Sequence, residues 1–277
     1  MKIVLSRKGF DSSAGGHASP ILPDGTMVSL PIPSPLDALA YSDIAIDRDR
    51  AHGNYADLIR ELDGGARIRG GAHLDPDLCA TSRPRPHGWR PAFGQIGSPG
   101  GHLRNEGVGR GDLFLFFGWF RHTTRADGRL QFVPGDAGFH ALFGYLEVGA
   151  AVDATGSAPL PIWLRDHPHA HPHRRASPNN TIYVATDTLS IDRSLPGAGV
   201  FRFRESLVLT KPGEPRSRWR LDRDVFGDVR ISHHDSAAWH DGAFQSCKRG
   251  QEFVVDADAR VIDWAAATIR TAPSAST

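Results

Sequence analysis

The chain has few cysteines, no surplus of either charge and no long hydrophobic run. Its two cysteines, Cys79 and Cys247, exclude a disulfide-stapled scaffold and a zinc site built from four thiolates. A net charge of +1 does not suit a protein that holds a long stretch of duplex DNA through its phosphates. No segment approaches the roughly 20 apolar residues of a membrane span. We therefore expect a cytoplasmic protein without a membrane partner.

Lysine is also scarce, with four residues, whereas histidine is abundant, with fourteen in a chain of 277 residues. Neutral imidazole is the commonest metal ligand in proteins and the usual proton carrier near neutral pH. The search for a functional site therefore starts from the histidines and from the carboxylates beside them.

Glycine and proline, thirty and twenty residues, divide the chain into short segments, so short strands and loops should outnumber long helices. We expect an α+β domain over residues 1–270 and a frayed tail at residues 271–277. The domain should contain a β-rich mixed sheet or a partly open barrel of short strands, with a few flanking helices. Apolar runs predict strands at residues 1–8, 111–120, 141–148, 181–185 and 200–210, the last broken near Arg204 and Glu205. They also predict a hairpin at 123–138 and helices at 49–63 and 257–270.

His73 and Asp75 form the first candidate metal pair. Residues two apart in an extended segment point to the same side, so the two side chains would converge. The first two ligands of a 2-His-1-carboxylate iron site converge in this way. Because His-x-Asp is a short motif, an ordinary loop in which Asp75 or Asp77 acts as a cap remains the alternative.

Residues 167–173 read HPHAHPH. Two internal prolines argue against a helix here, and an extended backbone would place all four imidazoles on one side. A polyproline-like backbone or a solvated loop would not align them. We take His167 and His169 as candidate catalytic groups.

Three further acid–base candidates lie elsewhere in the chain. His233 and His234 follow a strand-like segment, so at most one of them should enter a site. Glu252 leads into an apolar strand, where a buried carboxylate needs a metal, a cation or several donors. His140 could act in catalysis, or it could be a core histidine bonded to a backbone carbonyl.

The segment SRKGFDSSAGG follows the first predicted strand. Its cations, serines and glycines could cradle a phosphate with backbone N–H groups. The spacing is not that of a Walker loop, and GxGxxG, GxSxG and HExxH motifs are absent. We therefore expect Ser6, Arg7, Lys8 and Asp11 to bind the substrate rather than to form a known nucleotide loop.

Several longer strings, taken together, resemble those of the nucleotide modification associated domain 3 (Nmad3) family. The resemblance extends from residue 1 to about residue 256 and implies a single Nmad3-like domain that takes part in modifying nucleotides or DNA bases. It also implies partner enzymes of a modification pathway. The strings are LSRKGFDS (5–12), SPILPDG (19–25), LPIP (30–33), HLDPDL (73–78), GDLFLFFG (111–118), HALFGY (140–145), HPH (167–169), NTIYV (180–184) and GQEFV (250–254).

Our main hypothesis is a metal-dependent, oxygenase-like enzyme that oxidises a nucleotide, a nucleobase or a related small molecule. Imidazole and carboxylate ligands without a thiol suit one or two non-haem iron ions, with zinc or no metal as the alternatives. The expected metal ligands are His73, Asp75, His234 and Glu252, with His140, His167 and His169 as catalytic groups.

Two other hypotheses need no metal. A binding module with a barrel-like pocket could stack a base on aromatic residues such as Trp119. A transferase acting on nucleotides could use histidine as its general base. In all three cases the near-neutral charge favours a small or locally presented substrate over an extended duplex footprint.

Overall fold

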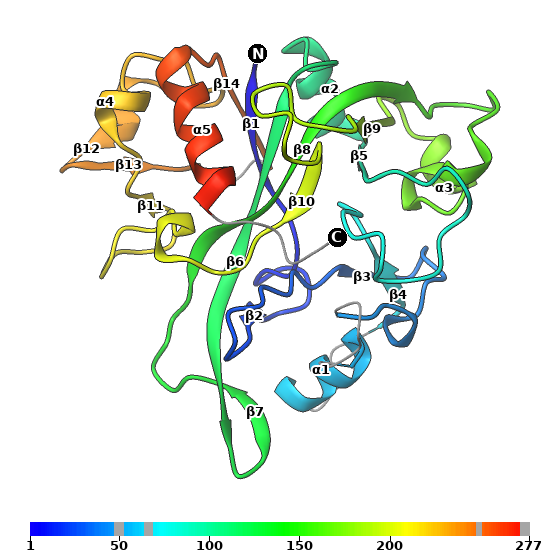
Figure 1. Ribbon diagram of the computed structural model, residues 1–277, viewed down its shortest axis with the longest axis horizontal. Helices are drawn as coiled ribbons and strands as arrows, with labels where there is room; N and C mark the ends of the chain where they lie inside the picture. Colours follow the sequence, from blue (N-terminus) through cyan, green and yellow to red (C-terminus); the bar gives the residue numbers. More distant parts are fainter. Residues whose placement is uncertain (47–52, 64–68, 248–250, 272–277) are drawn as a thin grey trace.

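The computed structural model describes residues 1–46, 53–63, 69–247 and 251–271, and one large mixed sheet dominates them (Figure 1). Its strands are β1 (Ile3–Arg7), β2 (Ser19–Ile21), β5 (Ala92–Gln95), β6 (Leu113–Ala126), β7 (Arg129–Phe132), β8 (Phe139–Asp153), β9 (Thr181–Ala185), β10 (Ala198–Val200) and β14 (Glu252–Val255). The main path runs β14-β1-β6-β8-β9-β5; β2 and β7 pair with β6, and β10 pairs with β8. This confirms the predicted α+β class, with an open mixed sheet and not a closed barrel.

Two small sheets and several short helices complete the fold. One sheet contains β11 (Arg218–Trp219), β12 (Trp239–His240) and β13 (Ala243–Gln245), and the other contains β3 (Ile32–Ser34) and β4 (Gly71–His73). The α-helices are α1 (Tyr55–Asp63), α2 (Gly97–Asn105), α3 (Pro172–Arg175), α4 (Arg223–Phe226) and α5 (Ala259–Thr271). The 3-10 helices are η1 (Tyr41–Asp43), η2 (Ile162–Leu164), η3 (Pro168–Ala170), η4 (Glu205–Leu207) and η5 (Ser236–Ala238).

The centre of the large sheet is made by β1 and the first half of β6. These strands are parallel, with Ile3 opposite Leu113 and Arg7 opposite Phe117. A parallel strand covered on both faces is apolar along its whole length, which explains the continuous run in β6. Because β1 ends at Arg7, the polar residues that follow it emerge at one end of this buried pair.

The helices follow the predicted spacing. The Asn54 side chain accepts a hydrogen bond from the Asp57 N–H at 2.9 Å and so caps the start of α1. Leu58 and Ile59 of α1 are buried in a second apolar cluster, and α5 buries Val261 and other residues against the main core. The first part of the helix predicted at 49–63 and most of the predicted tail lie outside the described residues.

The predicted strands at residues 1–8, 111–120, 141–148 and 181–185 correspond to β1, β6, β8 and β9. The hairpin turns at Asp127 and Gly128, which both have positive φ, as an Asp-Gly hairpin turn requires. The strand predicted over residues 200–210 was wrong for most of its length, although the break predicted near Arg204 and Glu205 coincides with the start of η4. Strand β10 ends at Val200 and η4 follows, and residues 202, 208 and 210 make only isolated bridges.

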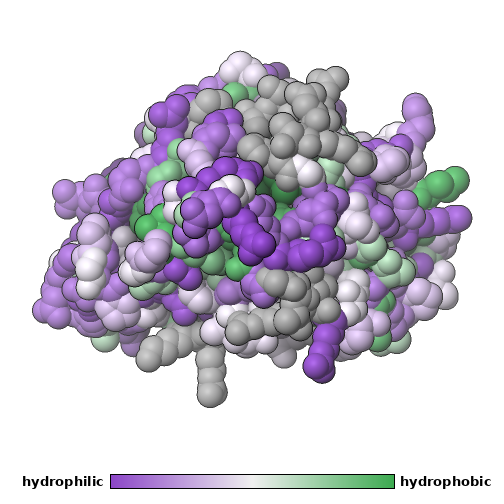
Figure 2. Space-filling model, turned by 90° about the horizontal axis from the view of Figure 1, so that it is seen from below, coloured by the Kyte–Doolittle hydropathy of each residue, from purple (hydrophilic) through white to green (hydrophobic). Residues whose placement is uncertain are grey.

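The surface is mainly hydrophilic on the face shown in Figure 2, where hydrophobic residues are visible chiefly in recesses. In the described part of the chain, the exposed large hydrophobic residues are Met1, Leu36 and Ile162. None of the helices within residues 1–46, 53–63, 69–247 and 251–271 has the length and apolar character needed to cross a bilayer.

Candidate metal centre

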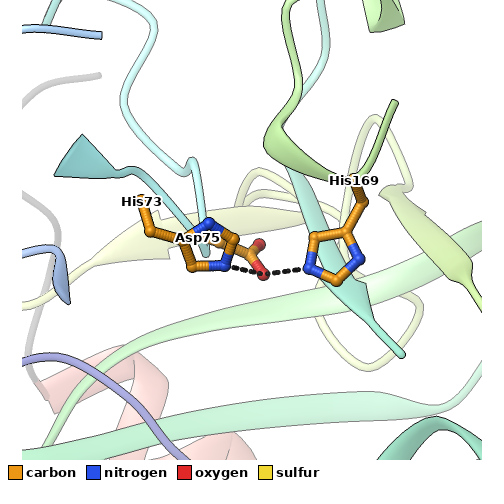
Figure 3. Close-up of side chains that lie close together, drawn as sticks. All are labelled: His73, Asp75 and His169. Carbon is orange, nitrogen blue, oxygen red and sulfur yellow. Dashed lines mark ion pairs between the residues drawn. The ribbon is translucent and has the colours of Figure 1, made fainter. Parts of the chain in front are cut away.

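His73, Asp75 and His169 converge on one point (Figure 3). The Asp75 Oδ2 atom lies 3.3 Å from His169 Nε2 and 3.8 Å from His73 Nε2. One ligand atom from each residue lies within 4.8 Å of the others. The side chains of Asp75 and His169 are each 4% exposed, and that of His73 is 13% exposed. This geometry could hold a single divalent ion in a protected position.

Residues distant in the sequence form this cluster. His73 ends β4, which pairs with β3 so that His73 lies opposite Ile32. Asp75 follows two residues later, as the His-x-Asp motif predicted. His169 comes from η3, in the histidine- and proline-rich segment.

The expectation that prolines exclude a helix from residues 167–173 was wrong. Pro168 is the first residue of η3 and Pro172 is the first residue of α3. Proline is tolerated at the first helical position, because the N–H that it lacks would have no helical partner there. The segment therefore turns twice, and its four imidazoles do not share one side of an extended strand.

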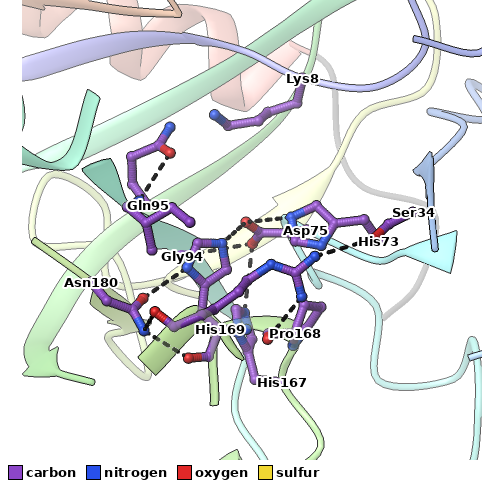
Figure 4. Close-up of polar contacts among 12 residues, drawn as sticks. Lys8, Ser34, His73, Asp75, Gly94, Gln95, His167, Pro168, His169 and Asn180 are labelled. Carbon is purple, nitrogen blue, oxygen red and sulfur yellow. Dashed lines mark hydrogen bonds and ion pairs between the residues drawn. The ribbon is translucent and has the colours of Figure 1, made fainter. Parts of the chain in front are cut away.

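Each of the two histidines is held by a partner at its other ring nitrogen, and Figure 4 shows that of His169, Asn180. His73 Nδ1 lies 3.1 Å from Asp37 Oδ2, and His169 Nδ1 lies 2.9 Å from Asn180 Oδ1. Since both partners are acceptors, each Nδ1 carries the proton and each Nε2 is left as the lone-pair donor. Oxygen acceptors of this kind orient metal-binding histidines and set their tautomers. Sequence reasoning did not identify Asp37 and named Asn180 only as part of a string.

Asp37 is fixed in turn by Arg174, whose Nη1 and Nη2 atoms donate to its two oxygens at 2.6 Å each. Burial raises the pKa of Asp37, but hydrogen bonds from His73 and Arg174 outweigh this and hold it well below its usual value. Asp37 is therefore an anion in the folded protein, and it can stabilise His73 as an Nδ1–H tautomer.

Asp75 is anchored through one oxygen and presents the other. Its Oδ1 accepts a hydrogen bond from the Gly94 N–H at 2.9 Å and lies 3.5 Å from His167 Nε2. His167 Nδ1 accepts from the His169 N–H at 3.2 Å, which places the His167 proton on Nε2, toward Asp75. Burial raises the pKa of Asp75, but His167 and His169 outweigh this and keep it well below its usual range. His167 thus helps to position Asp75 through Oδ1, and the Oδ2 atom of Asp75 is left available to bind an ion.

Gly94 allows His169 to approach the sheet. A Cβ atom at this position would lie 2.3 Å from His169 Cγ, closer than any real contact. Only glycine fits between strand β5 and the imidazole, so the β5 backbone helps to place both His169 and Asp75.

A cavity of about 240 Å³ opens beside the three ligands. Its wall includes Arg7, Lys8, Asp11, Gln95 and Gln251, together with the ligands. Residues from the predicted substrate segment therefore lie next to the candidate metal centre, although the segment is far from His73 and His169 in the sequence.

Glu252 faces the same region but has other partners. Its Oε1 accepts hydrogen bonds from Lys8 Nζ at 2.7 Å and from Gln95 Nε2 at 2.6 Å. Its Oε2 and the neighbouring Ser6 Oγ are buried and have no hydrogen-bond partner among the described residues. Glu252 is not one of the three grouped residues, and its described partners are the cation of Lys8 and the amide of Gln95.

His234, predicted as a metal ligand, lies apart from the other ligands. Its Nδ1 is 2.9 Å from the Ser232 carbonyl oxygen, and its Nε2 accepts from the Cys247 N–H at 2.9 Å. With both ring nitrogens engaged by the backbone, the imidazole has no lone pair left for an ion. It borders a different hollow of about 780 Å³, which His73 and Asp75 do not line.

His140 also lies apart from the three ligands, on the wall of a third cavity. Its Nδ1 accepts a hydrogen bond from Trp219 Nε1 at 3.1 Å, so its proton resides on Nε2. Burial lowers its pKa to about 3, and the charges of Arg7 and Arg216 act in the same direction. At neutral pH this histidine is neutral, and it can donate from Nε2.

The low pKa of His140 predicts an acid-dependent loss of stability. An unfolded histidine binds a proton below its ordinary pKa of 6.5, whereas the folded one does so only near 3. The contribution of neutral His140 to the free energy of unfolding is therefore complete above pH 6.5, and it is lost as the pH falls toward 3. Between pH 7.5 and 5 this amounts to about 2 kcal/mol of unfolding free energy.

Urea unfolding at the two pH values checks this. The wild type should lose about 2 kcal/mol more than the His140→Gln variant, which has no titrating group at this position. Equal losses in the two proteins would show that His140 titrates normally in the folded state.

Comparison with known proteins gives one match. The family model described as nucleotide modification associated domain 3 matches residues 2–256. No curated protein and no solved structure matches the chain. The matched range contains the three ligands, their supporting residues and the polar segment at the end of β1.

Proposed function

Since the chain belongs to the nucleotide modification associated domain 3 family, we propose that it is a metal-dependent enzyme that modifies a nucleotide. His73, Asp75 and His169 would hold one divalent ion. The observation that carries this proposal is the convergence of two Nε2 atoms and one carboxylate oxygen, with both histidine tautomers already set by Asp37 and Asn180. A supporting shell of this kind is typical of metal sites.

Iron(II) is the ion that we favour. Two imidazoles and one carboxylate, without a thiol, make up the facial triad of non-haem iron enzymes, which leaves coordination positions open. Zinc in catalytic sites also accepts three such ligands plus water, so the ligand set alone admits it. Because the three residues are the one such group among the described residues, we propose one ion rather than two.

The bound ion would supply activation of dioxygen for oxidation of the substrate. If this is a two-electron oxidation such as a hydroxylation, the substrate provides two of the four electrons that reduce dioxygen to the level of water, and an organic co-substrate would provide the other two. The chain's own residues orient the reaction: Gly94 and His167 hold Asp75, and Lys8 and Gln95 border the cavity where the substrate would bind.

The dimensions of the cavity favour a small substrate. About 240 Å³ suits a base or a nucleoside, and the net charge of +1 offers little attraction for a long duplex. We therefore propose a free nucleotide as the substrate class, in preference to duplex DNA, whose base would first have to be extracted.

Metal analysis of protein produced without a histidine tag or nickel column tests this proposal. We expect close to one iron per chain in protein handled without oxygen, and dioxygen uptake that depends on an added nucleotide. Stoichiometric zinc would favour a hydrolytic reaction and would overturn the oxidative part of the proposal. Nucleotide binding or turnover that is unchanged in protein shown to be free of metal would instead favour one of the metal-free hypotheses.

A further inference from the structure

The third cavity, whose wall includes His140, has a volume of about 350 Å³ and adjoins the cavity beside the candidate metal centre. Arg7 at the end of β1, Trp119 of β6 and Arg216 just before β11 contribute to its wall, with Asp11 and His140. Arg7 and Arg216 are more than two hundred positions apart in the sequence, and only the fold brings them to the same cavity.

The guanidinium groups of these two arginines are not paired with a carboxylate among the described residues. Neither guanidinium makes a hydrogen bond or an ion pair with them. Burial lowers the pKa of Arg216; Asp11 acts in the opposite direction, and the nearby Arg7 lowers the pKa further. Arg216 also lies over the Trp119 ring, 3.8 Å from its centroid, so its planar group is held in place. Two cations that repel each other at a partly buried wall favour the binding of an anion.

Of the neighbouring charged residues, Lys8 and Arg174 are already in ion pairs, whereas Asp11 is not. Lys8 forms a buried ion pair with Glu252, and Arg174 is paired with Asp37. Asp11 accepts hydrogen bonds from Ser13 and from the Ala14 N–H, and it makes no ion pair with a described residue. The single negative charge of Asp11 offsets part of the charge of the two arginines, and the wall of the cavity keeps a net positive charge.

His140 adds a neutral donor to the same wall. Its Nδ1 is occupied by Trp219, and its Nε2–H makes no hydrogen bond to a described residue. Guanidinium groups match the geometry of phosphate oxygens, and a further N–H can complete their coordination.

The two cavities share a wall. Arg7, Lys8 and Asp11 line both of them. A ligand whose anionic end contacts Arg7 and Arg216 is thus next to the ligands of the metal centre.

We propose that Arg7 and Arg216 bind the phosphate of a single nucleotide whose base and sugar extend toward His73, Asp75 and His169. The proposal rests on the function proposed above and names its substrate as a phosphomonoester. The sequence analysis expected Lys8 to bind the substrate, but Lys8 is paired with Glu252. Our proposal gives the binding of the phosphate to Arg216 together with Arg7.

Calorimetric titration with the four deoxynucleoside 5′-monophosphates and the matching nucleosides tests the assignment. We expect at least one monophosphate to bind the wild type about tenfold or more tightly than its nucleoside, since two charge-assisted contacts are added. In the Arg7→Gln and Arg216→Gln variants the monophosphate should fall to the affinity of the nucleoside. The Arg129→Gln variant, which changes an exposed arginine of β7, should behave as the wild type.

Iron content, measured in the same samples, separates this proposal from the previous one. We expect both arginine variants to retain the metal, because neither residue touches the ligands. Equal binding of monophosphate and nucleoside to the wild type, or unchanged discrimination in both variants, would overturn the phosphate subsite and leave the metal centre standing. Tighter binding of a short single-stranded oligonucleotide than of any monophosphate would overturn the choice of a free nucleotide.

Discussion

The Asp75→Asn variant is expected to lose its metal. Removal of the negative charge from Oδ2 leaves only two neutral imidazoles, so the affinity for a divalent ion should fall at least about 100-fold, the upper end of what loss of a supporting residue causes. Equilibrium competition with a chelator measures the affinity, and elemental analysis measures the content.

The substitution should leave the fold intact, because the asparagine oxygen can still accept the hydrogen bond from the Gly94 N–H. Circular dichroism and thermal unfolding check this. The matched control is Asp228→Asn, whose side chain is 82% exposed; it should bind metal as the wild type does. Unaltered metal content in a folded Asp75→Asn variant would exclude the proposed ligand set.

The Glu252→Gln variant is expected to lose stability and to keep its metal. The Lys8 and Glu252 side chains are 9% and 1% exposed, and the substitution leaves the lysine charge buried without its partner. Removal of one member of a buried ion pair costs about 3–5 kcal/mol of unfolding free energy. Urea unfolding measures this loss.

A second substitution isolates the charge effect. In a Lys8→Met, Glu252→Gln double variant neither group is charged, so part of the lost stability should return. Loss of metal in a Glu252→Gln variant of normal stability would instead make Glu252 a ligand, as the sequence alone had suggested.

Much of the fold could be predicted because its signals are local. The apolar run that begins β6 and the Asp-Gly turn that follows it depend only on neighbouring residues, and both predictions were confirmed. The segment at residues 200–210 misled because its apolar residues are buried by packing around η4 rather than by pairing in a ladder. A buried irregular segment and a buried strand have a similar content of apolar residues, so the composition of residues 200–210 could not distinguish them.

The candidate site shows the same division. His73 and Asp75 are two residues apart, and their convergence follows from extended geometry. The sequence analysis named His234 as a metal ligand and His169 as a catalytic group, because the sequence does not show what each ring nitrogen contacts. His169 Nδ1 meets Asn180, which leaves Nε2 available, whereas the backbone engages both nitrogens of His234.

The amino-acid sequence was sufficient for the α+β class, the family resemblance and the local pair of His73 and Asp75, since each depends on composition or on adjacent residues. The third ligand, the supporting Asp37 and the pairing of Lys8 with Glu252 depended on three-dimensional packing. The position of Arg7 and Arg216 on the wall of one cavity depended on it as well. Those contacts join segments that are far apart in the chain, and the burial and hydrogen bonds that assign their roles exist only once the sheet has brought the segments together.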